Sequence, residues 1–231
     1  MEGTEVRKLA ELEDDHWWYR ERRHLLAKAV SGLTPGRALD IGAAGGGNTR
    51  VLRQHGWDAV ALEYGADGAE VAHGRGLATI RGDATRLPLA DASLDLVVAF
   101  DLLEHLVDDD AAVAEVRRVL KPTGTYLVAV PADPRLWSDH DEAVDHVRRY
   151  TREGLVDLLD RGGFEVTDVR SWNVLLRPVV AMRRKTSSGS DLDDMHPLVN
   201  WGLRTIITAE RYLPVGGLPG VSLLLRAQPR S

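Results

Sequence analysis

Short apolar runs alternate with longer amphipathic segments over the first two thirds of the chain. Strands are predicted at 37–42, 58–64, 77–84, 94–101 and 124–132. Helices are predicted between them at 46–55, 66–75 and 109–120. Strands that alternate with helices pair in parallel through right-handed crossovers, so the pattern predicts an α/β protein with a doubly wound sheet.

The two ends of the chain are less regular. Residues 5–30 carry apolar positions at helical spacing, and 151–163 predicts a helix with Thr151 as its N-cap and Gly162 as its stop. Two more strands are predicted at 164–172 and 221–228. About 48 residues separate these strands, far more than a hairpin needs.

The long separation is interpreted as an insertion over 174–220 that covers part of the sheet edge or the substrate mouth. It is expected to hold a mobile loop at 183–194 and an apolar-faced helix near 197–213. We predict one domain, 1–231. Its parts are an N-terminal lid or helix (1–32), a ligand-binding core (33–173), the cap-like insertion (174–220) and the last strand (221–231).

Composition narrows the function classes. The 231 residues carry a net charge of −6, so the chain has no excess of positive charge that would attract the phosphates of a nucleic acid. The chain has no cysteine, which excludes disulfides, thiolate metal sites and cysteine nucleophiles. The N-terminus MEGTEVRKLAELEDD is unlike a signal peptide, and no apolar run approaches the ~18 residues of a membrane span. We therefore expect a cytoplasmic protein without integral membrane association.

The segment LDIGAAGGGNTR, residues 39–50, places small residues between a predicted strand and a predicted helix. Such a turn lets a ligand touch backbone N–H groups at the helix start. A dinucleotide site needs glycines at G-x-G-x-x-G. Counting from Gly42 the second position is Ala44, and counting from Gly45 the third is Arg50. The chain also lacks a Tyr-x-x-x-Lys pair, but a nicotinamide-dependent oxidoreductase or epimerase stays open as an alternative.

Asp40, Gly42 and Gly46 resemble motif I of the class I S-adenosylmethionine-dependent methyltransferases. Ala44 departs from that motif, which usually has glycine there, and alanine is tolerated if its φ is negative. The resemblance extends over about residues 36–170. It includes GDATRLP (82–88), LDLVVAFDLLEHL and EVRRVLKPTGTYLVAVP.

The resemblance implies a Rossmann-like sheet of seven mostly parallel strands, the last antiparallel, with helices on both faces and an N-terminal lid helix. It implies S-adenosyl-L-methionine as cofactor. Glu63, 21 residues after Gly42, would accept from the ribose hydroxyls. Asp83 would accept from the adenine amino group, and the Ala84 N–H would meet a ring nitrogen. The predicted cofactor residues are Asp40, Gly42, Ala43, Gly46, Glu63, Tyr64, Asp83, Ala84, Phe100, Asp101, Tyr19 and Trp17.

Methyl transfer from a sulfonium is an in-line displacement, so a base is needed only when the acceptor must lose a proton. The candidate bases are His146, His140 and His105, with His146 slightly favoured because 146–151 resembles a family segment H-x-R-R-Y-T. Alternatively, His146, Arg148 and Arg149 only brace a loop.

We expect no metal, because the spacings of histidines and aspartates match no ligand template. The aspartates at 108–110 are expected in the first turn of a helix instead.

The predicted acceptor is a small molecule such as a natural product, sugar or lipid-linked precursor, methylated on oxygen or nitrogen. FDLL stands where enzymes that methylate amino groups of DNA bases carry Asn/Asp-Pro-Pro-aromatic, so no nucleic-acid partner is expected. The 174–220 insertion suits an aromatic-walled pocket, or the surface of a homodimer. A further alternative is a regulatory module that binds the cofactor without turnover.

Overall fold

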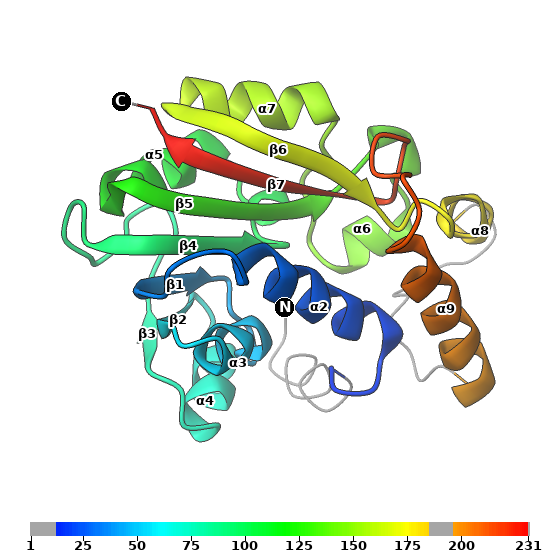
Figure 1. Ribbon diagram of the computed structural model, residues 1–231, viewed down its shortest axis with the longest axis horizontal. Helices are drawn as coiled ribbons and strands as arrows, with labels where there is room; N and C mark the ends of the chain where they lie inside the picture. Colours follow the sequence, from blue (N-terminus) through cyan, green and yellow to red (C-terminus); the bar gives the residue numbers. More distant parts are fainter. Residues whose placement is uncertain (1–12, 185–195, 231) are drawn as a thin grey trace.

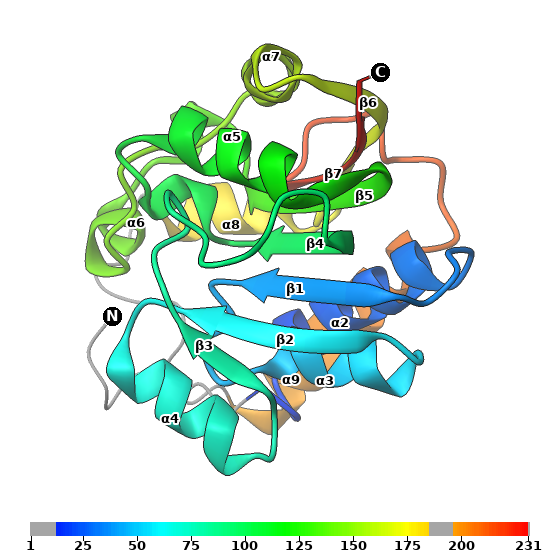
Figure 2. The ribbon, with the colours of Figure 1, turned by 90° about the vertical axis from the view of Figure 1, so that its left-hand side faces the viewer.

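A seven-stranded sheet with helices on both faces forms the body of the protein (Figure 1, Figure 2). The computed structural model describes residues 13–184 and 196–230. The strands follow the order β3-β2-β1-β4-β5-β7-β6. They are β1 (Arg37–Ile41), β2 (Asp58–Glu63), β3 (Thr79–Arg81), β4 (Leu94–Phe100), β5 (Leu120–Pro131), β6 (Phe164–Trp172) and β7 (Ser222–Pro229).

Among the described strands, β7 runs in the opposite direction to the other six. It pairs antiparallel with both β5 and β6, and the other pairings in the sheet are parallel. The prediction of a mostly parallel seven-stranded sheet with an antiparallel last strand is therefore confirmed.

The helices link the strands and cover them. They are α2 (Trp17–Val30), α3 (Gly47–Gln54), α4 (Ala66–Gly74), α5 (Asp109–Val119), α6 (Asp139–Ala143), α7 (Arg152–Arg161), α8 (Arg177–Arg183) and α9 (Pro197–Glu210). Two short 3₁₀ turns, η1 (Leu103–His105) and η2 (Pro134–Leu136), follow the ends of β4 and β5.

Both faces of the sheet are buried, which explains the continuous apolar runs of its central strands. In β4, Leu96 and Val98 point to the core shared with α2, α3 and α9, while Val97 and Ala99 point to the core shared with α5 and α7. Each fully buried Val or Leu of this kind contributes about 1.5–3 kcal/mol of transfer free energy. The helices on both faces therefore cover the sheet, and a ligand can reach it at the ends of its strands.

The sequence pattern located the elements better than their ends. β3 has three residues instead of the eight predicted, and it is the edge strand beside β2. β5 begins at Leu120, directly after α5, whereas the prediction started at Gly124. The strand passes this stretch through an irregularity opposite Leu94 and Leu96. α8 was not predicted.

Capping predictions are confirmed. The Thr151 hydroxyl accepts the Gly154 N–H at 2.9 Å and begins α7, and Gly162 ends it. Asp108 caps α5 by accepting the Ala111 N–H at 2.9 Å, and Asp109 and Asp110 follow in the first turn. There their negative charge meets the positive end of the helix dipole.

The described part of the insertion packs against α2 (Figure 1). The Asn200 side chain accepts the Trp17 N–H at 2.9 Å and donates to the Asp15 carbonyl at 3.0 Å. Arg211 forms a two-pronged ion pair with Glu21, with N–O distances of 3.0 and 2.6 Å. α9 therefore fixes the position of α2 on the sheet. Most of the predicted loop at 183–194, and the predicted helix before residue 13, lie outside the described residues.

Among the described helices, none is long and apolar enough to cross a membrane.

The turn between β1 and α3 gives a stability prediction. Gly46 has a φ of +81°, and a Cβ there would lie 2.2 Å from Leu77 Cδ1. We expect Gly46→Ala to lower the free energy of unfolding by about 1–3 kcal/mol, through left-handed strain and overlap. Gly74→Ala is the matched control, because Gly74 ends a helix and nothing lies within 4 Å of its added Cβ. Urea denaturation measures both, and equal stability of the two variants would contradict the prediction.

Candidate active site

Three acidic residues stand at one edge of the sheet. Asp40 lies near the end of β1, Glu63 ends β2 and Asp101 directly follows β4. These strands are parallel neighbours, so their carboxyl ends meet. The order reverses between β1 and β4, which is where doubly wound sheets bind ligands.

The glycine turn after β1 is held in a left-handed conformation. Gly42 has a φ of +70° and donates its N–H to the Leu62 carbonyl at 2.9 Å. Ala44 has a φ of +45°, so the negative φ under which alanine would be tolerated is not found. The Ala44 N–H donates to Glu63 Oε2 at 2.7 Å. That charge-assisted bond offsets part of the strain at Ala44.

Glu63 is positioned from two sides. Its Oε1 accepts the Gly65 N–H at 3.1 Å, and a Cβ at Gly68 would lie 2.8 Å from its Cγ. A carboxylate oxygen can accept two hydrogen bonds, and one is described for each oxygen of Glu63. Glu63 can therefore still accept hydrogen bonds from ribose hydroxyls. Asp83 is oriented similarly, because Oδ1 accepts both the N–H and the hydroxyl of Thr85 at 2.8 Å. Both acids thus have fixed carboxylates in the positions that the sequence predicted.

Asp40 differs from the other acids because it is only 1% exposed. Its Oδ2 accepts the Thr49 hydroxyl at 2.6 Å, and Oδ1 has no hydrogen-bond partner among the described residues. Burial raises its pKa to about 7. An orphaned buried acceptor beside a turn of small residues fits a ligand that brings a polar hydrogen.

α2 is fastened across the end of β4. Arg22 is buried and forms an ion pair with Asp101, whose φ is +53°. The guanidinium lies 4.7 Å from the ring centroid of Trp18 and 4.7 Å from that of Phe100. Burial raises the pKa of Tyr19, and the charge of Asp101 adds to the effect. Arg22 was not predicted, although it follows the aromatic run WWY in the sequence.

The remaining predicted cofactor residues are spread around these groups. Trp17 packs in the hydrophobic core with α3, while Tyr64 is 74% exposed directly after β2. Ala43 and Ala84 are buried beside the glycine turn and after β3. Their contact with a cofactor stays a prediction.

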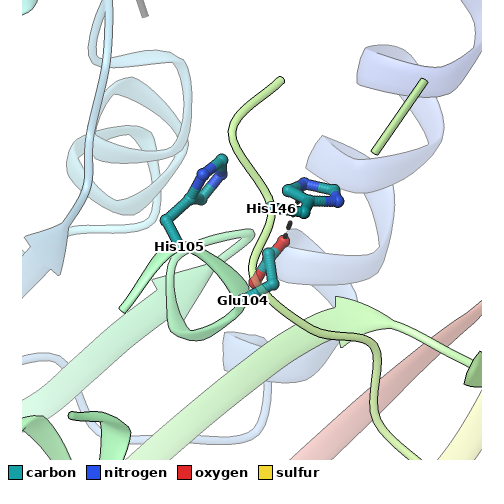
Figure 3. A group of neighbouring side chains, drawn as sticks. All are labelled: Glu104, His105 and His146. Carbon is teal, nitrogen blue, oxygen red and sulfur yellow. Dashed lines mark ion pairs between the residues drawn. The ribbon is translucent and has the colours of Figure 1, made fainter. Parts of the chain in front are cut away.

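A second group lies past the end of β4, at η1 (Figure 3). His105 and His146 place their ring centroids 4.8 Å apart. His146 Nε2 lies 3.8 Å from Oε1 of Glu104, which is fully buried. The chain brings the two segments together through the Val147 N–H, which donates to the Glu104 carbonyl at 2.8 Å. Glu104 was not predicted, although it stands beside His105 in the sequence.

Asp141 organises the segment that carries His146. It is fully buried and accepts from His146 Nδ1 at 2.9 Å, Arg149 Nε at 2.7 Å and Arg184 at 3.2 Å. Burial alone would raise its pKa, but the His146 hydrogen bond and the two arginine charges outweigh burial and lower the pKa to about 2. The brace that was considered as an alternative role for His146 and Arg149 is therefore present, and Asp141 is its centre.

His140 lies on α6, with its ring centroid 6.5 Å from that of His146. Arg148 makes separate contacts: it donates to the Val107 carbonyl at 2.8 Å and pairs with Asp109 at 2.9 Å. The three histidines predicted as bases thus lie in one region. The shorter of the two ring-centroid distances is the 4.8 Å between His105 and His146.

A cavity of about 350 Å³ lies between α2 and α3. It is lined by Asp14, Arg23, His24, Ala27, Gly47, Arg50, Val51, Gln54 and His55. None of the predicted cofactor residues lines it. The candidate site is therefore the group of acids at the carboxyl ends of the strands.

Comparison with known proteins finds a family model that matches the same part of the chain. Residues 39–128 match the family model described as "Methyltransferase domain". That range begins in β1 and ends within β5, so it contains the glycine turn, Glu63, Asp83 and Asp101.

Two curated relatives cover different shares of the chain. A "Probable S-adenosylmethionine-dependent methyltransferase" of Mycolicibacterium smegmatis is 33% identical over 71% of this chain and 66% of its own length. A "Demethylmenaquinone methyltransferase" of Mycobacterium sp. (strain KMS) is 34% identical over 53% of this chain and 52% of its own. The chain thus spans about two thirds of the first relative's length and about half of the second's.

The fold recurs in solved structures. An S-adenosylmethionine-dependent methyltransferase from Mesorhizobium loti matches 94% of this chain and 99% of its own, with a TM-score of 0.64 and 17% identity. At that identity the likeness concerns the fold alone.

The Asp141 network predicts a pH-dependent stability. A carboxyl whose pKa is lowered from 3.8 to about 2 stabilises the fold above pH ~4 and loses that contribution as the pH falls toward 2. The difference in pKa corresponds to about 2 kcal/mol. We expect Asp141→Asn to lower the free energy of unfolding by about 2–4 kcal/mol at pH 7, since it leaves buried arginines without their anion.

Chemical denaturation from pH 7 to pH 2.5 checks this expectation. The gap between wild type and Asp141→Asn should narrow as the pH falls. Asp139→Asn, an exposed change on the first turn of the same helix, is the control and should follow wild type. A gap that stays constant with pH would show that the Asp141 charge is not what stabilises the segment.

Proposed function

The chain belongs to the class I S-adenosylmethionine-dependent methyltransferases, and from that premise we propose that it methylates an oxygen or nitrogen of a small-molecule acceptor. Bound S-adenosyl-L-methionine supplies a methyl group that its sulfonium has already activated. The protein then has to hold the donor, orient the acceptor and keep water away.

The observation that carries the proposal is the pair of oriented carboxylates at neighbouring strand ends. Glu63 ends β2 and is tied to the glycine turn through Ala44, and Asp83 follows β3 with its carboxylate fixed by Thr85. These positions suit the ribose hydroxyls and the adenine amino group. The glycine turn does not suit a dinucleotide, because the G-x-G-x-x-G pattern lacks its second glycine when counted from Gly42 and its third when counted from Gly45.

α2 supports the proposal as a lid over the strand ends. The Arg22–Asp101 ion pair, stacked between Trp18 and Phe100, docks the helix where the methyl group would be transferred. A docked helix excludes water, which strengthens every electrostatic interaction beneath it. The acceptor would then lie between this helix and the group of His105 and His146, which the sequence predicted as candidate bases.

The surroundings favour an apolar acceptor. Large apolar side chains are exposed on α8 and α9, at Val179, Met182, Leu198, Val199 and Trp201. A relative that acts on demethylmenaquinone is consistent with this reading. We therefore propose a hydroxylated or amino-bearing molecule with an apolar body. A cytoplasmic location and a homodimer stay predictions.

Cofactor binding tests the site directly. We expect Glu63→Gln and Asp83→Asn each to weaken S-adenosylmethionine binding about 10- to 100-fold, because each removes acceptor capacity of a charged group. Asp58→Asn, an exposed change at the opposite end of β2, should leave the affinity unchanged. Isothermal titration calorimetry gives the three constants, and wild-type affinity in both site variants would refute the assignment.

Turnover separates the enzyme from a non-catalytic cofactor-binding module. We expect S-adenosylhomocysteine to accumulate when the protein meets a suitable member of a panel of phenols, quinols, sugars and amines. Detection of S-adenosylhomocysteine by mass spectrometry measures it, with Glu63→Gln as the matched control. Tight cofactor binding without product across the whole panel would favour the regulatory alternative.

A further inference from the structure

We propose that Glu104, His105 and His146 form a binding site for a divalent transition-metal ion. Each offers one ligand atom, and these atoms all lie within 4.8 Å of one another (Figure 3). Two imidazoles and one carboxylate on one side of a vacant point are a common ligand set for such ions. The spacing matches no ligand template, because two ligands are adjacent in the chain and the third follows about 40 residues later.

Glu104 supplies the first independent observation. Its side chain is fully buried, and neither carboxylate oxygen has a hydrogen-bond partner among the described residues. A buried carboxylate without hydrogen bonds is costly unless a cation compensates it. Its nearest positively chargeable neighbour is the His146 ring at 3.8 Å, which is beyond hydrogen-bond distance.

His146 has a carboxylate bound to its far ring nitrogen, a contact typical of histidines that bind metals. Its Nδ1 is bound by the buried Asp141 carboxylate at 2.9 Å, so Nδ1 carries the hydrogen and Nε2 keeps a lone pair. Nε2 is the atom that faces Glu104. The Asp141 contact therefore fixes both the tautomer and the direction of the ring.

His105 is prepared in the same way. Its Nδ1 lies 3.2 Å from the Asp145 carbonyl. A carbonyl only accepts, so Nδ1 must donate and Nε2 is again the free ligand atom. Both rings thus offer Nε2, and both are oriented by oxygen atoms of the 141–146 segment.

The spacing suits an ion after a small adjustment. Bonds of ~2.0–2.2 Å place neighbouring ligand atoms ~3–3.5 Å apart. The Glu104–His146 separation of 3.8 Å is already near this value. The widest separation of 4.8 Å closes by rotation of side chains, and His105 is only half-buried and so has room to turn. Imidazole nitrogens favour Mn²⁺, Fe²⁺, Co²⁺ or Zn²⁺ over Mg²⁺ or Ca²⁺.

This inference rests on the proposed function for its chemical role. Three protein ligands leave open positions, where the oxygen of an acceptor hydroxyl would bind. Coordination lowers the pKa of that hydroxyl, and its proton passes to water. The oxygen then forms its bond to the methyl carbon as the carbon–sulfur bond breaks, which leaves S-adenosylhomocysteine. The site therefore favours methylation on oxygen over nitrogen, and His105 and His146 act as ligands rather than as bases.

Metal titration of the chelator-treated protein tests the site without any acceptor. We expect Co²⁺ and Mn²⁺ to bind with one-to-one stoichiometry by calorimetry, and Co²⁺ to produce visible absorption bands of a nitrogen-ligated site. Glu104→Gln, His105→Ala and His146→Ala should each weaken binding at least 100-fold. His73→Ala, which removes an exposed histidine on α4, should bind as wild type does.

Circular dichroism and thermal unfolding identify any variant that fails to fold. His105→Ala keeps the test decisive in that case, because it alters a half-buried ring outside the Asp141 network. Unchanged Co²⁺ binding in folded His105→Ala and Glu104→Gln, or no binding to wild type, would overturn the inference. S-adenosylmethionine affinity is measured on the same samples. If the wild-type protein binds S-adenosylmethionine but no metal ion, only the metal site is refuted, whereas absent cofactor binding by the wild type refutes the proposed function.

Discussion

Parallel strands deliver their carboxyl ends to one edge of a sheet, and β1 is flanked on both sides by parallel partners. The acids Asp40, Glu63 and Asp101 lie together because of this pairing. β2 supplies Glu63, β4 leads into Asp101 and η1, and the helical layers bury both faces of the sheet. With the faces closed, the strand ends are the place where backbone N–H groups and carboxylates remain available to a ligand. The strand order reverses between β1 and β4. In the proposed function, the β2 side of this point holds the methyl donor (the donor side) and the η1 side faces the acceptor (the acceptor side).

Charge is distributed unevenly between these two sides. On the donor side, Glu63 is satisfied by the N–H groups of Ala44 and Gly65. On the acceptor side, Asp141 meets a histidine and two arginines, while the fully buried Glu104 has no hydrogen bond. If Glu104 served only to hold this loop, an apolar residue of similar size in its place would give a more stable protein. The isolated carboxylate is therefore better explained by a ligand than by stability.

Periodicity and motif spacing predicted the strand ends that carry the acids proposed to hold the methyl donor. The acids Asp40, Glu63 and Asp83 lie close to predicted strand ends, and a parallel sheet brings such ends together. The acceptor side was not predictable in the same way. Glu104 and Asp141 look like ordinary surface acids in the sequence, because a 3₁₀ turn and a five-residue helix have no periodicity long enough to reveal burial. The left-handed φ of Ala44 was missed because it depends on the hydrogen bond from its N–H to Glu63, a residue 19 positions away.

The roles of the histidines follow from what lies behind each ring. A general base needs a lone pair directed at the substrate, and a carboxylate behind the ring raises its basicity. His146 has that carboxylate in Asp141, but its Nε2 faces Glu104 of the protein itself instead of a bound methyl acceptor. The His146 Nε2 lies 3.8 Å from the buried Glu104 carboxylate, and the His105 ring lies beside it. This spacing is too long for direct proton transfer and suits an ion between the three groups. The geometry that makes His146 a poor base is thus the same geometry that makes it a good ligand.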